Sequence, residues 1–238
     1  MIVNKKSFTK GVLLMLSFTA VFFVILMPIF PGEKGRVTGL DYADNLFNRL
    51  SKGSSWFIPE IAPRVQAMEG KKIEVAVPLK KAASADAVVR LFTANGAAAN
   101  TEGGLVHVKA DFGKLLGAVL ADCEAMYNDK PEPVSAKYGM DGYKALAVWW
   151  EALQPMIKEL QKIKRIPEAQ TLDLVIRKGI EPAYNFQGIA TGSVKKEFGI
   201  MLALLIFYVV YTLWYGFAIF ELFEGFGLSM KKGKKQEA

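Results

Sequence analysis

The side chains that most often carry out chemistry are sparse in this chain of 238 residues. There is a single histidine, His107, and the sequence contains neither G-x-S-x-G nor H-E-x-x-H. His107 lies in LVHVK, where alternation places it opposite Val106 and Val108, as a polar residue on a strand face. We therefore expect no catalytic residue, no metal site and no cofactor, and we expect that the protein is not an enzyme. An envelope enzyme that uses carboxylates and His107 stays open as an alternative.

The single cysteine, Cys123, lies in a run that predicts an amphipathic helix capped by Asp111. It shares the apolar face of that helix, and its immediate neighbours are Asp122 and Glu124. A reactive thiolate requires exposure and nearby cations, which this pattern does not offer. Cys123 is therefore interpreted as a small buried apolar residue.

Polar side chains also interrupt an apolar run near the C-terminus. Tyr208, Tyr211, Thr212 and Tyr215 occupy about 100° of the circumference when each residue of a helix turns by about 100°. Lipid tails accept no hydrogen bonds, so such a stripe should pack against another helix. We expect a partner helix in the membrane. Packing on the first apolar run, which offers Ser17 and Thr19, is the alternative within the chain.

Two glutamates, Glu221 and Glu224, follow the tyrosine stripe on another side of the same predicted helix. They come at the end of the apolar run, where we expect the cytoplasmic edge of the membrane. There they should be hydrated or paired with nearby lysines. A contact with a neighbouring subunit, or a proton relay into it, is the alternative.

Two long apolar runs must position these groups. Residues 11–30 and 198–220 contain no Asp, Glu, Lys, Arg or His. Helices of this length cover the hydrocarbon layer of a bilayer, which is about 30 Å thick. We predict transmembrane helices at residues 11–31 and 198–224. The first is expected to be an uncleaved anchor, because no small-x-small cleavage site follows it.

Lysines at the two ends of the chain predict its orientation. Lys5, Lys6 and Lys10 precede the first run, and the lysines after the second run are Lys231, Lys232, Lys234 and Lys235. Because clustered Lys and Arg next to helix ends stay inside, residues 1–10 and 225–238 are expected to be cytoplasmic tails. Residues 32–197 would then form an extracytoplasmic domain, and the protein would lie in the plasma (inner) membrane.

The predicted extracytoplasmic domain is helix-rich α+β with a small sheet. KKIEVAVPLKK and LVHVKA are predicted strands, with Ile73, Val75 and Val77 on one face of the first. A helix capped by Ser84 and ended by Asn95-Gly96 lies between them, and AAANTEGG is expected to be a flexible connector. The order strand, helix, strand, helix predicts a βαβ-like unit at residues 71–128.

The strongest soluble helix pattern follows this unit. Apolar residues alternate at spacings of three and four along one seam, which comprises Leu146, Trp149, Leu153, Met156, Leu160 and Ile163. The seam should pack inside the domain, and packing against a partner helix is the alternative. Trp149 and Trp150 should then belong to the core, although one of the two rings must point off the seam. Pro155 is expected to kink the helix or to start a second one. A further helix should begin at Pro167 and stop at Gly179.

These features predict a non-catalytic membrane-anchored subunit that scaffolds or stabilises a larger membrane protein complex. Its partners should be the lipid bilayer and other transmembrane subunits. A nucleic-acid partner is not expected despite the net charge of +7, because no basic stripe is interleaved with aromatic residues. Two alternatives stay open: an extracytoplasmic sensor or solute-binding module that signals through a partner, and a self-oligomerising envelope scaffold.

Overall fold

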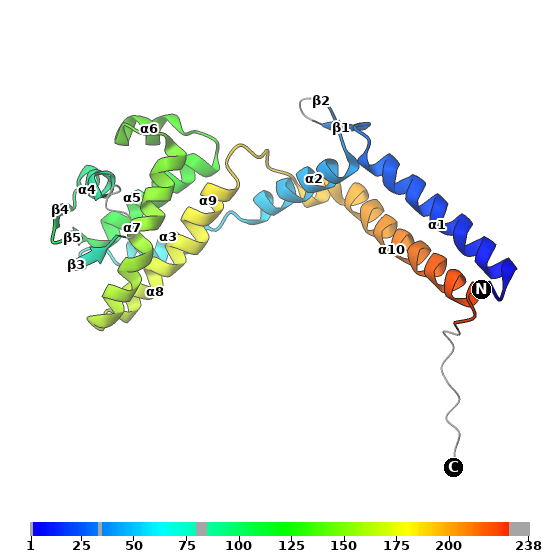
Figure 1. Cartoon of the computed structure of the whole chain (residues 1–238). Coiled ribbons are helices and arrows are strands. Elements are labelled where there is room, and N and C mark those ends of the chain that lie inside the picture. Colours follow the sequence, from blue (N-terminus) through cyan, green and yellow to red (C-terminus); the bar gives the residue numbers. More distant parts are fainter. Residues whose placement is uncertain (1, 33–34, 80–84, 229–238) are drawn as a thin grey trace, which may run out of the picture. The chain divides into compact units, whose positions relative to one another are not determined.

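The computed structural model describes residues 2–32, 35–79 and 85–228, which form a helix-rich structure with small sheets (Figure 1). The chain divides into two compact units. One unit comprises residues 1–50 and 192–238, and the other comprises residues 51–191. Residues 32–50, which we expected to belong to the central domain, thus group with the two terminal segments.

Two long helices dominate the first unit. α1 (Lys5–Leu26) and α10 (Val194–Gly225) are both long and apolar enough to cross a membrane. They run antiparallel and side by side in Figure 1. The Asn4 side chain caps α1 by accepting from the Ser7 amide, and the backbone amides of Val3 and Asn4 donate to the Gly225 carbonyl. The start of α1 is therefore bonded to the end of α10.

A short hairpin and most of one amphipathic helix, up to residue 50, complete this unit. β1 (Phe30–Gly32) pairs antiparallel with β2 (Gly35–Val37), and α2 (Gly39–Ser54) follows. Near its end, the Arg49 carbonyl accepts from the Gly192 amide at 2.9 Å, and the Arg49 guanidinium pairs with Glu197 at 2.7 Å. These bonds tie α2 to the beginning of α10.

The second unit contains a three-stranded sheet. The strand order is β3 (Lys72–Pro78), β5 (Leu105–Asp111) and β4 (Ala98–Glu102), and both pairings are antiparallel. The prediction of a βαβ-like unit was wrong, because β3 and β5 are antiparallel. The prediction of a flexible connector was also wrong, because Ala98–Glu102 forms a strand. Gly103 and Gly104 both have positive φ and make a tight two-residue hairpin that turns β4 into β5. The predicted face of Ile73, Val75 and Val77 is buried.

Helices cover the sheet and build the core of this unit. α3 (Ile58–Gln66) and α4 (Ala85–Ala94) flank β3 in sequence, and α5 (Phe112–Tyr127) follows β5. The Asp111 side chain accepts from the Lys114 amide and caps α5, as predicted. α5 is the central helix, because it packs against α3, α7, α9 and the π-helical turn described below.

The remaining helices pack around α5. They are α6 (Glu132–Tyr138), α7 (Gly142–Lys162), α8 (Ile166–Val175), the π-helical turn η2 (Ile176–Ile180) and α9 (Glu181–Asn185). The predicted seam of α7 is buried except for Ile163, which is exposed. α7 continues through Pro155 without a second start.

One predicted helix stop was wrong. The chain stays helical past Gly179 into α9. A Cβ atom at Gly179 would lie 3.1 Å from the Leu120 side chain, so this glycine permits close packing of η2 on α5. The predicted cap Ser84 and the lysines Lys231, Lys232, Lys234 and Lys235 lie outside the described residues.

Candidate functional site

Small residues bring α1 and α10 into close contact. A Cβ atom at Gly11 would lie 2.7 Å from the Leu222 amide nitrogen, and one at Gly225 would lie 2.7 Å from Phe8 Cα. Ala218, one turn before Leu222 on α10, is completely buried. Small residues allow the backbones of membrane helices to approach closely, where van der Waals packing holds them together. The chain thus carries its own helix-packing seam.

Tyr211 extends this seam toward the middle of the two helices. Its hydroxyl donates to the Phe18 carbonyl at 3.2 Å, and its ring stacks on the Phe18 ring with centroids 4.2 Å apart. The ring of Tyr215 tilts against the same phenylalanine at 5.1 Å. For these two tyrosines, the structure shows the alternative within the chain: they pack on the first apolar helix.

The other two members of the predicted stripe do not contact α1 through their polar groups. Thr212 donates to the Tyr208 carbonyl one turn earlier in the same helix, at 2.7 Å. Tyr208 is 66% exposed, and its hydroxyl has no hydrogen-bond partner among the described residues. Ser17, which the sequence offered as a partner for the stripe, instead donates its hydroxyl to the Leu14 carbonyl in its own helix.

The two glutamates at the end of α10 have different surroundings. Glu221 pairs with Lys10 of α1 at 2.6 Å. For this glutamate, the structure thus shows the expected pairing with a nearby lysine. One carboxylate oxygen of Glu224 is buried and has no hydrogen-bond partner. The ion pair closes the same end of the helix pair at which Gly225 meets Phe8.

An open apolar groove of about 750 Å³ lies at the other end of the helix pair. Its residues come from α1, α2 and α10, all in the first unit, and include Phe22, Leu40, Phe47, Tyr208 and Tyr211. Leu40 and Phe47 are exposed on α2. The unpartnered hydroxyl of Tyr208 therefore belongs to a residue that lines an unfilled apolar surface.

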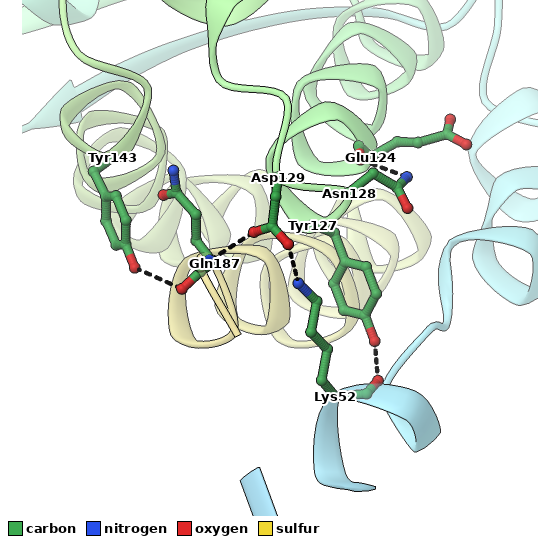
Figure 2. Close-up of polar contacts among 8 residues, drawn as sticks. Lys52, Glu124, Tyr127, Asn128, Asp129, Tyr143 and Gln187 are labelled. Atoms are coloured by element: carbon green, nitrogen blue, oxygen red, sulfur yellow. Dashed lines mark hydrogen bonds and ion pairs between the residues drawn. The ribbon is translucent and has the colours of Figure 1, made fainter. Parts of the chain in front are cut away.

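A second group of polar contacts lies where the chain enters and leaves the second unit (Figure 2). Asp129 follows α5 in the left-handed conformation, with φ of 56°. Its carboxylate pairs with the Lys52 ammonium at 2.8 Å and accepts from the Gly188 amide at 2.6 Å. We call Lys52, Asp129 and Gly188 the junction cluster, because one carboxylate holds both the incoming and the outgoing segment.

Aromatic residues enclose the junction cluster. The Lys52 ammonium lies 5.3 Å from the centre of the Tyr127 ring, and the Tyr127 hydroxyl donates to the Lys52 carbonyl. Trp56 packs against that tyrosine, with ring centroids 4.9 Å apart. Burial raises the pKa of Tyr127. Lys52 is consequently only 1% exposed, which is rare for a lysine unless it is paired.

A buried carboxylate organises the interior of the second unit. Asp122 accepts from Trp149 Nε1 at 3.0 Å, from the Lys137 ammonium at 3.0 Å and from the Tyr138 hydroxyl. Burial, with the nearby Asp122, raises the pKa of Tyr138 well above its usual value. Sequence reasoning treated Asp122 only as a neighbour of Cys123. The only available signal was its charge within a mostly apolar helix.

The residues that we considered for chemistry are not brought together. His107 lies on β5 opposite Ala76 and Asn100, and Cys123 is fully buried in the core. Burial, followed by the charge of Asp122, raises the pKa of the Cys123 thiol. Within residues 2–32, 35–79 and 85–228, no group of three or more His, Cys, Asp and Glu side chains could hold a metal ion.

The fold and these features define a class: a helix-rich chain in which two paired, membrane-length helices precede and follow an α+β unit. No protein-family model matches the chain, and neither a curated protein nor a solved structure is significantly similar to it.

Proposed function

We propose that the protein is a non-catalytic membrane-anchored subunit that stabilises a larger membrane protein complex. In this proposal α1 and α10 span the plasma (inner) membrane, both termini lie in the cytoplasm, and residues 32–197 lie outside. The length and hydropathy of the two helices support insertion. The terminal lysines support the orientation.

The observation that carries the proposal is the position of the Tyr208 hydroxyl. Tyr208 comes ten residues after Phe198, the first residue of the charge-free run, which is about 15 Å along a helix. It would thus lie near the middle of a hydrocarbon layer about 30 Å thick. Lipid tails offer no acceptor there, and neither does α1.

A transmembrane helix of another protein would satisfy this hydroxyl. Such a helix would lie in the apolar groove beside Leu40, Phe47 and Tyr208 and would offer a backbone carbonyl or a Ser/Thr hydroxyl as the acceptor. The second unit would then be held at the membrane surface beside the partner complex. A second copy of this chain in the groove would instead indicate the self-oligomerising scaffold.

The test is purification of the full chain from its native membranes in a mild detergent, with mass spectrometry of the proteins that remain bound. Tyr208→Phe removes only the hydroxyl. Because hydrogen bonds between membrane helices are worth about 0.6–1.7 kcal/mol, it should weaken retention of the partner by about threefold to eighteenfold. Tyr215→Phe is the matched control, since the Tyr215 hydroxyl would lie near the cytoplasmic edge, within reach of water.

The outcomes separate the alternatives. Stoichiometric foreign subunits that are lost from Tyr208→Phe and kept by Tyr215→Phe support the proposal. Recovery of a homo-oligomer alone points to the scaffold. A chain that is recovered as a monomer, or partners retained equally by both variants, would overturn the role of the groove.

A further inference from the structure

A pocket of about 390 Å³ lies on the second unit, apart from the junction cluster and from the buried Asp122. α7 contributes Leu146, Ala147 and Trp150, and η2 with α9 contributes Ile180, Glu181, Tyr184 and Asn185. Leu146 and Ile180 are almost fully buried and belong to the hydrophobic core. The pocket therefore has an apolar base and a rim of aromatic and polar residues.

Its aromatic walls are not part of the hydrophobic core. Trp150 is 40% exposed, whereas the adjacent Trp149 is completely buried against Phe92 and Asp122. Tyr184 is exposed as well, and its ring meets the ring of Tyr143 edge to face at 5.0 Å. Exposed aromatic surface on a folded unit is typical of a binding site when it lines a concave, mainly apolar pocket.

A carboxylate is held against one aromatic wall. Glu181 accepts a hydrogen bond from Trp150 Nε1 at 3.4 Å, so its negative charge lies at the edge of the indole ring. None of the described residues that line the pocket is a lysine, an arginine or a histidine. The negative charge of Glu181 is therefore not neutralised by a basic residue of the pocket wall.

We infer that this pocket binds a small organic cation, of the alkylated or quaternary ammonium class. The faces of aromatic rings attract a cation through their quadrupoles, and tryptophan attracts cations more strongly than tyrosine or phenylalanine does. A methylated ammonium also has the apolar surface that Leu146 and Ile180 would cover. Glu181 supplies the opposite charge. An alkylated ammonium loses less hydration on entering the pocket than a compact inorganic cation would.

Choline and its neutral isostere 3,3-dimethylbutan-1-ol provide the test, because they share a shape and differ in charge. Binding of each is measured by titration calorimetry on the full chain in a non-ionic detergent. Choline should bind at least tenfold more tightly than the isostere. Trp150→Leu should weaken choline binding by about tenfold, and Glu181→Gln by about fivefold with a smaller dependence on salt. Glu124→Gln, an exposed carboxylate on α5, should leave binding unchanged.

Thermal unfolding of each variant serves as the check on folding, and Glu181→Gln preserves the size of the side chain. Equal binding of choline and the isostere would show that the pocket recognises only apolar surface and would overturn the inference. So would unchanged choline affinity in a folded Glu181→Gln variant, the absence of choline binding, or preferential binding of an uncharged sugar. None of these results depends on a membrane partner, so the inference fails or holds separately from the proposed function.

Discussion

Removal of the Asp129 carboxylate should destabilise the second unit far more than removal of the Lys52 ammonium, although the two groups form one ion pair. The reason is their unequal burial. The Lys52 side chain is 1% exposed, whereas that of Asp129 is 42% exposed. Asp129→Asn therefore leaves an ammonium in the interior without its counterion, while Lys52→Met leaves a carboxylate that water can still solvate.

The two substitutions are chosen to change little else. Asparagine tolerates the left-handed conformation at φ of 56° and keeps an acceptor for the Gly188 amide. Methionine keeps the unbranched aliphatic stem that packs beside Tyr127. The difference between the variants should then report the buried charge.

The magnitudes follow from that difference. Loss of one partner from a fully buried pair costs about 3–5 kcal/mol, and partial access of water at Asp129 reduces this to about 2–3 kcal/mol for Asp129→Asn. Lys52→Met should cost less than about 1 kcal/mol, because the remaining carboxylate is hydrated. The double variant has no buried charge and should regain most of the stability that Asp129→Asn loses.

Thermal unfolding in a non-ionic detergent measures these costs, with Trp56 as a fluorescent reporter beside Tyr127. For a unit of this size, Asp129→Asn should lower the unfolding midpoint by roughly 8 °C, and Lys52→Met by less than about 4 °C. If the two single variants are equally unstable, or if the double variant loses the sum of their costs, the argument from unequal burial is refuted.

The remaining predictions concern the helix seam and the buried thiol. Gly11→Leu should force α1 away from Leu222, which is measured as an increased distance between spin labels on α1 and α10, whereas Gly216→Leu should not, because nothing lies within 4 Å of a Cβ atom there. An unchanged distance in Gly11→Leu would contradict the close approach of the helices. Because burial raises the pKa of the Cys123 thiol, the folded protein at pH 8 should hold less thiolate than a free cysteine and should react with iodoacetamide many times more slowly than the unfolded protein. Rapid alkylation of the folded protein at that pH would contradict the burial.

Several elements were predictable because their signals are local. Both membrane-length helices follow from uninterrupted apolar runs, and the buried face of β3 follows from alternation. The cap at Asp111 also appeared as predicted, and so did the buried seam of α7 except for Ile163. β4 was missed because Ala98–Glu102 contains only polar and small residues, so its pairing depends on the neighbouring strand β5 rather than on its own β-propensity.

The candidate site was only partly predictable. The four polar residues of the stripe lie on one α-helix, as predicted. However, the face of α10 that packs on α1 is set by the small residues Gly11, Ala218 and Gly225, where the two helices approach closely. Tyr211 lies on that face, whereas Tyr208 lies off it. A helical wheel gives the angles between residues of one helix, but it does not show which face of that helix a second helix packs against.

Hydropathy and periodicity in the sequence thus determined which segments are long apolar helices and which residues face the core. Only the tertiary structure decided which polar groups meet. Asp129 reaches Lys52 across 77 positions, and Asp122 reaches Trp149 across 27. Such pairs form because packing of the intervening segments brings their side chains together and excludes water, and no pattern within a short window of residues encodes that packing.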